Sequence, residues 1–180
     1  MPVTVRRASA PDAEGLSRLA ALTFPLACTP RTPADFLATY VATGLDPASF
    51  RSHLADPACT VLLAEDEAGP DPVGYTMLLV GEPVDPDVAA AIHHRPPVEL
   101  VRFYVHPDHH GTGTAGLLME QTLAAAASTG ARGAWLGVSE ENARANAFYA
   151  RHGFAPVGRK RFHIGETWED DVVRERELRL

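Results

Sequence analysis

The sequence predicts a single domain, residues 1–180, with a mixed α/β fold in which helices cover both faces of one sheet. The length of 180 residues is that of one domain, and the 46% of apolar residues can form a core. Strand-like segments follow one another near both ends of the chain, which is typical of hairpins. In the middle, strand, helix and strand alternate, which is typical of a parallel crossover.

Seven segments either alternate between apolar and polar residues or are continuously apolar and β-branched, which predicts strands. The predicted strands are 3–8, 59–66, 73–80, 98–105, 133–139, 154–164 and 171–180. Turn-forming residues separate the second strand from the third, so these two are expected to form a hairpin. The last two strands are expected to close the sheet.

Helices are predicted where an apolar stripe recurs at helical spacing between start and stop signals. The predicted helical segments are 9–24, 32–44, a short turn within 46–57, a short piece at 88–92, 114–128 and 141–153. Residues 81–97 are rich in proline and aspartate and read as a surface excursion, and connections of that length are often functional.

Composition excludes several classes of function. The net charge is −7 with no basic block, so a nucleic-acid partner is not expected. No apolar run approaches the roughly 18 residues that span a membrane, and the N-terminus does not resemble a signal peptide. Cys28 and Cys59 lack metal or redox spacing and read as reduced thiols, which predicts a cytoplasmic protein. Lys160 is the only lysine among 16 Lys and Arg residues, which we interpret as the coding bias of a GC-rich genome.

The segment "VHPDHHGTGTAGLLME", residues 105–120, places a glycine-rich loop between a strand and a helix. Such a loop presents successive N–H groups, and the helix dipole adds partial positive charge, so the segment predicts an anion site suited to phosphate. Gly111 and Gly113 would let a ligand approach the backbone. The spacing fits neither a P-loop nor the dinucleotide-binding fingerprint.

Two motifs carry a resemblance to a known family. His110 to Ala115 resembles the acyl-CoA signature of the GCN5-related N-acetyltransferase (GNAT) superfamily, with His110 where arginine or glutamine is usual. The segment "WLGVSEENARANAFYARHGF", residues 135–154, resembles the strand and helix that follow in that family. The resemblance implies the GNAT fold, a mostly antiparallel mixed sheet of six to seven strands whose central parallel strands splay apart. It also implies an acetyl-CoA-dependent N-acetyltransferase that uses no metal.

The resemblance also assigns roles to residues. The acetyl-CoA site would comprise Phe103, Tyr104, Val105, His110, Gly111, Thr112, Gly113, Thr114, Ala115, Gly116, Asn142 and Tyr149. The N–H of Val105 would bind the thioester carbonyl, and Tyr149 would protonate the departing sulfur. Glu99 would act as base for the amine, directly or through water, with a pKa raised near the sheet interior.

Each role has a structural alternative. Tyr149 could be a core residue, Asn142 could satisfy backbone groups at a helix start, and Glu99 could pair with Arg102. The histidines at 93, 94, 106, 109 and 110 suggest a metal site, but their spacing lacks the regularity of zinc ligands, so no metal is expected.

The expected activity is transfer of an acetyl group to a primary amine of a small molecule, peptide or protein. Its acceptor pocket would come from residues 24–54 and 81–97, and the acidic charge balance favours a cationic acceptor. The rival hypothesis is an acyl-CoA-binding sensor without turnover, to which only His110 points. A homodimer is expected from the habit of the family.

Overall fold

The computed structural model describes residues 2–67, 69–164 and 166–179. The chain divides into two compact units. The first unit contains Met1–Leu78 and Arg102–Thr122, and the second contains Leu79–Val101 and Leu123–Leu180. Two strands and one helix pass from one unit into the other.

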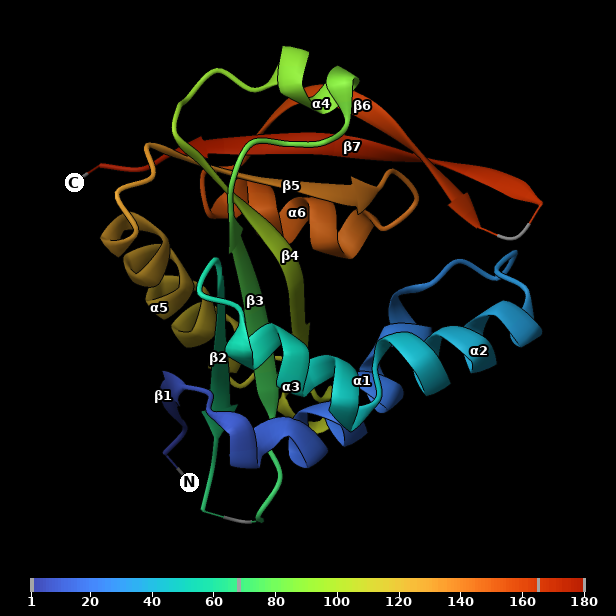
Figure 1. Ribbon diagram of the computed structural model, residues 1–180, viewed down its shortest axis with the longest axis vertical. Coiled ribbons are helices and arrows are strands. Elements are labelled where there is room, and N and C mark those ends of the chain that lie inside the picture. Colours follow the sequence, from blue (N-terminus) through green and yellow to red (C-terminus); the bar gives the residue numbers. More distant parts are fainter. Residues whose placement is uncertain (1, 68, 165, 180) are drawn as a thin grey trace. The chain divides into compact units, whose positions relative to one another are not determined.

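Seven strands form one mixed sheet in the order β1-β2-β3-β4-β5-β7-β6, which confirms the predicted fold class (Figure 1). Their bounds are β1 Thr4–Arg7, β2 Cys59–Glu65, β3 Gly74–Val80, β4 Pro97–Val105, β5 Gly133–Ser139, β6 Ala155–Ile164 and β7 Thr167–Glu177. β1 and β2 pair antiparallel, as do β5 with β7 and β6 with β7. β4 and β5 pair parallel, as the predicted crossover requires.

Most helices lie where the sequence signals place them. They are α1 Ala13–Ala27, α2 Ala34–Gly44, α3 Pro47–Ala55, α4 Pro86–Ala91, α5 Thr114–Ser128 and α6 Ala143–Arg151, with 3-10 turns η1 Ala10–Asp12 and η2 Pro107–His109. α3 and α4 begin alike. An aspartate caps each helix, Asp46 accepting from the N–H of Ser49 and Asp85 from the N–H of Asp87, and a proline follows each aspartate.

The last strand and the first helix differ from the prediction. β7 begins at Thr167 rather than residue 171, because its ladder with β6 extends to the pair Ile164–Thr167. Backbone hydrogen bonds with β6 extend β7 over residues 167–170, whose sequence shows no alternation of apolar and polar residues. The first predicted helix divides into η1 and α1, because Asp12 accepts hydrogen bonds from the Ser9 N–H and from Arg6.

In the second unit, α4 and α6 cover opposite faces of the sheet. Val88 and Ile92 of the α4 region pack against Trp135 on β5 and Val173 on β7. The next residue, Arg174, points to the other face, where it donates from Nε to Asn146 Oδ1 of α6 at 2.9 Å. Gly158 on β6 lets α4 come this close, since a Cβ there would lie 2.6 Å from the Ala91 Cβ.

Candidate active site

The glycine loop has the open backbone that an anion site requires. Gly111 has φ +79° and Gly113 has φ +92°, values that side-chain-bearing residues rarely adopt. A Cβ at either position would meet nothing within 4 Å, so the space beside the loop is open. α5 begins directly after the loop at Thr114, and its 15 residues aim the N-terminal end of the helix dipole at the loop.

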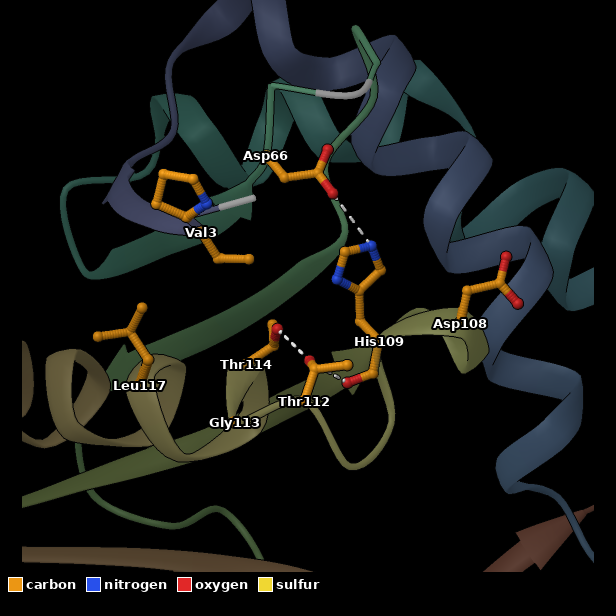
Figure 2. A pocket seen from close by; sticks show the side chains of 9 residues that line it. Val3, Asp66, Asp108, His109, Thr112, Gly113, Thr114 and Leu117 are labelled. Carbon is orange, nitrogen blue, oxygen red and sulfur yellow. Dashed lines mark hydrogen bonds and ion pairs between the residues drawn. The ribbon is translucent and has the colours of Figure 1, made fainter.

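Side chains of the loop, together with Asp66 just after β2, hold this backbone in place (Figure 2). His109 Nε2 lies 3.2 Å from Oδ2 of Asp66, which follows β2, and the two side chains are only 20% and 10% exposed. The Thr112 hydroxyl donates to the His109 carbonyl at 2.8 Å and lies 2.9 Å from the Thr114 hydroxyl. A histidine–carboxylate pair and two threonine hydroxyls therefore hold the loop in its conformation.

A pocket of about 480 Å³ lies beside the loop (Figure 2). Its lining comprises Pro2, Val3, Asp66, Asp108, His109, Thr112, Gly113, Thr114 and Leu117. Two carboxylates in this lining oppose a phosphate group. A pyrophosphate is therefore expected at the N–H groups of the loop and not inside this pocket.

Along the end of β4, successive residues point their backbone N–H and C=O groups to opposite edges of the strand. The N–H of His106 donates to the Val73 carbonyl at 2.8 Å, which directs the even-numbered residues toward β3. By strand alternation, the N–H groups of Phe103 and Val105 point to the opposite edge. His110 Nε2 lies 3.0 Å from the Val105 carbonyl and donates to it. The His110 ring thus braces the loop against the strand that the acyl arm is expected to pair with.

Glu99 lies in a polar cluster of the second unit. The parallel ladder contains the pairs Pro97–Gly133, Val98–Ala134 and Glu99–Trp135, and Glu99 is its last residue. Because paired residues share a face, Glu99 lies on the α4 face with Trp135. Burial raises the pKa of the half-buried Glu99 carboxyl, and the positive charge of Lys160 partly offsets this rise. The raised pKa is the direction expected for a base.

Lys160 and Asp171 complete this cluster. Lys160 pairs with Asp171 across β6 and β7, and its ammonium lies 5.7 Å from the centre of the Trp135 ring. A Cβ on Gly137 would lie 3.0 Å from Lys160 Nζ and 3.2 Å from Asp171 Oδ2, so both groups reach over the bare backbone of β5. Burial raises the pKa of Asp171 as well, and Lys160 again offsets the rise.

The alternative pairing of Glu99 with Arg102 finds no support, because Arg102 has other neighbours. Arg102 belongs to the first unit, where its Nη2 donates to the Tyr40 hydroxyl at 3.3 Å. Its guanidinium lies 5.7 Å from the centre of the Phe50 ring.

α6 carries Tyr149 on the face of the sheet opposite Glu99. Tyr149 contacts the rings of Phe148 and Phe154 at centroid distances of 5.6 and 5.9 Å. Burial raises the pKa of its phenol, so it is protonated at neutral pH, as a proton donor must be. These aromatic contacts also fit the alternative role of Tyr149 as a core residue.

Asn142 caps α6: its Oδ1 accepts from the N–H of Ala145 at 3.0 Å. This bond is the structural alternative that the sequence offered. The cap uses Oδ1, and Nδ2 is the atom that a pantetheine contact would engage. Asn146, which sequence reasoning missed, ties α6 to β5 by donating to the Ser139 carbonyl at 2.9 Å.

The two segments expected to form the acceptor pocket belong to different units. In the first unit, Tyr40 of α2 stacks between Phe24 and Phe36, with centroid distances of 4.6 and 6.0 Å. In the second unit, the buried carboxylate of Glu175 holds residues 93 and 94 by accepting their backbone N–H groups at 2.8–2.9 Å. Sequence reasoning missed Glu175. The sequence predicts that it lies in a strand, but it does not indicate which backbone groups its carboxylate binds.

The side chains of His93, His106 and His109 have structural partners. His93 pairs with Glu175, His106 Nδ1 accepts from the Asp108 N–H, and His109 pairs with Asp66. Within residues 2–67, 69–164 and 166–179, no three His, Cys, Asp or Glu side chains are placed to hold a metal ion. In the same ranges, no helix is long and apolar enough to cross a membrane.

The first unit thus carries a glycine loop at the N-terminus of α5, and the second unit carries a half-buried carboxylate and a phenol on opposite faces of the sheet. Residues 27–154 match the profile of the Acetyltransferase (GNAT) family. An uncharacterized N-acetyltransferase of Mycobacterium tuberculosis (strain ATCC 25618 / H37Rv) is 41% identical over 167 residues, covering 93% of this chain and 98% of the relative.

Solved structures agree on the fold. A PaiA N-acetyltransferase from Thermoplasma acidophilum, in complex with coenzyme A, has a TM-score of 0.76 at 15% identity, covering 98% of this chain and 99% of that one. NAA60 from Arabidopsis thaliana, in complex with a bisubstrate analogue, has a TM-score of 0.70 at 18% identity, covering 99% and 100%. The chain belongs to the GNAT family of acetyltransferases and is an acyltransferase.

Proposed function

We propose that this N-acetyltransferase transfers the acetyl group of acetyl-CoA to a primary amine, with Glu99 as base and Tyr149 as acid. The observation that carries the proposal is the placement of these two side chains in the second unit. Glu99 lies on the α4 face at the last pair of the parallel ladder, and Tyr149 lies on the α6 face. Acyl transfer needs a base for the amine and a proton donor for the departing thiol, and these two groups supply both.

The residues of the glycine loop fit the phosphates of the donor. The open backbone at Gly111 and Gly113 and the N-terminus of α5 would bind the pyrophosphate, and Thr112, Thr114, Ala115 and Gly116 continue this cradle. The pantetheine arm would pair with the β4 edge to which the N–H groups of Phe103 and Val105 point. Tyr104 stacks on Tyr75 at 5.6 Å, which fixes this part of the strand.

The resemblance to the family bears on how Glu99 acts. We propose that Glu99 takes the proton of the acceptor ammonium, directly or through water, and that the N–H of Val105 binds the thioester carbonyl.

The chemical step requires little else. The neutral amine attacks the thioester carbon, a C–N bond forms, the C–S bond breaks, and the sulfur takes the proton of Tyr149. The nitrogen loses one proton to water as it becomes an amide, and water returns a proton to the Tyr149 phenolate. The backbone N–H that binds the carbonyl stabilises the charge that develops on its oxygen. Glu99 and Asp171 give the α4 face an acidic character, which supports an acceptor that arrives as an ammonium ion.

The test is release of CoA thiol from acetyl-CoA in the presence of pooled amines: polyamines, aminoglycosides, amino acids and short peptides. We expect at least one pool to exceed the background without acceptor. Tyr149→Phe and Glu99→Gln should each slow turnover by about 10²-fold and keep acetyl-CoA binding, as expected for a proton-transfer group. Turnover that neither change slows would refute the assignment of acid and base.

Silence in all pools, with acetyl-CoA still bound in calorimetry, would favour the sensor hypothesis. The cytoplasmic location and the homodimer stay predictions, as does the absence of nucleic-acid and membrane partners. Fractionation of cells and light scattering of the purified chain would check the first two.

A further inference from the structure

We propose that Lys160 is an acceptor in its own right, and that the enzyme acetylates it with its own acetyl-CoA. This inference rests on the proposed function. Lys160 is the only lysine of the chain, against fifteen arginines among the 16 Lys and Arg residues. A lysine offers a primary amine that can lose its proton, and an arginine does not. The one primary-amine side chain of the protein thus lies beside the candidate base.

The position of the Lys160 ammonium supports the proposal. Nζ reaches over Gly137, whose missing side chain leaves the room: a Cβ there would lie 2.4 Å from Lys160 Cε. Gly137 lies on β5 two residues beyond Trp135, which forms the last pair of the ladder with Glu99. The amine therefore lies over the stretch of β5 that follows the ladder, on the α4 face that also carries Glu99.

The groups around Nζ are those that an acceptor amine needs. The Trp135 ring, 5.7 Å away, attracts the ammonium form, and Glu99 and Asp171 are carboxylates that can take its proton. The buried indole N–H of Trp135 has no hydrogen-bond partner among the described residues. The carbonyl oxygen of an acetyl group is an acceptor of the kind that this donor lacks.

In the proposed step the ammonium passes one proton to a carboxylate, Nζ attacks the thioester carbon of acetyl-CoA, an amide bond forms and the C–S bond breaks. The sulfur takes a proton from Tyr149 and leaves as CoA thiol. The nitrogen releases its second proton to water as the amide forms, and water returns a proton to the Tyr149 phenolate. The product, acetylated Lys160, is neutral, so the modification removes the positive charge that stands between two half-buried carboxylates.

The experiment is incubation of the full chain with acetyl-CoA and no other amine, followed by intact-mass spectrometry and peptide mapping. We expect one acetyl group on Lys160, with a rate that does not change when the protein is diluted, because the reaction occurs within one molecule. Tyr149→Phe and Glu99→Gln should slow it at least tenfold. Lys160→Arg should remove it and should leave only any acetylation of the N-terminal amine, which the peptide map separates.

Two results would overturn the inference. One is modification of Lys160 at equal rates in the native chain, in Tyr149→Phe and in the heat-unfolded chain, which is plain chemical acetylation. The other is an unmodified Lys160 in a preparation that turns over pooled amines, which leaves the proposed function intact. If neither Lys160 nor any pooled amine is acetylated while acetyl-CoA binds, both proposals fail together.

Discussion

At the scale of single residues, Glu99 is the group whose environment most resembles that of a catalytic base. Burial raises the pKa of its carboxyl and Lys160 only partly reverses the rise. A base works in its ionised form, so the rate should rise with pH through a pKa above the ordinary value of about 4.3. In Glu99→Gln this limb of the kcat/KM profile should disappear. If the variant shows the same rise in kcat/KM at the same pH, the rise reports the titration of another group.

His110 is the residue at which this chain departs from the usual acyl-CoA signature. Its ring donates to the Val105 carbonyl. An arginine is always charged and binds phosphate with two donors. We expect His110→Arg to tighten acetyl-CoA at pH 8, measured by calorimetry. An unchanged Kd would mean that the side chain at this position serves the strand and not the phosphates.

At the scale of elements, the glycine loop depends on a backbone shape that only glycine adopts readily. Gly113→Ala meets no steric obstacle, but alanine at φ +92° costs about 1–2 kcal/mol. The loop should shift, and KM for acetyl-CoA should rise about tenfold with a smaller change in kcat. Gly130→Ala, at φ +84° after α5 and also in open space, carries the same strain away from the loop and is the matched control that should leave KM unchanged.

The segment between α4 and β4 depends on Glu175, a side chain only 5% exposed that accepts backbone N–H groups from two residues. In Glu175→Gln an NH2 group replaces one of the two oxygens that accept these backbone N–H groups. We expect the loss of charged hydrogen bonds to lower the free energy of unfolding by about 2 kcal/mol. Urea unfolding should register this loss, and the amides of residues 93 and 94 should exchange faster. Glu177→Gln, on the exposed end of the same strand, should change neither.

At the scale of the whole molecule, acetyl-CoA should stabilise the chain against unfolding. A ligand that binds only the folded state adds about 2.7 kcal/mol at one hundred times its Kd. For a chain of this length that corresponds to a rise in Tm of about 5–10 °C. Thermal denaturation with and without acetyl-CoA measures it. A shift that survives in Gly113→Ala at its full size would contradict binding at the loop.

Much of this molecule followed from its sequence. Period-two strands, the crossover around 98–139 and the glycine loop were all local patterns, and the structure places them as predicted. The extension of β7 to Thr167 was not visible, because cross-strand hydrogen bonds with β6 hold it and no side-chain pattern marks it. The two 3-10 turns likewise follow from contacts with side chains and carry no periodicity of their own.

The sequence by itself determined the fold class, the family and the anion-binding loop, because each depends on backbone preferences and spacing within a short segment. Only the tertiary structure decided which charges share a neighbourhood. It placed Lys160 near Glu99 and Asp171. It also placed Arg102 against the Tyr40 hydroxyl and the buried Glu175 carboxylate against the N–H groups of residues 93 and 94. These partners lie between 11 and 82 residues apart along the chain. Such pairings depend on strand register and sheet order, which no local pattern in the sequence specifies.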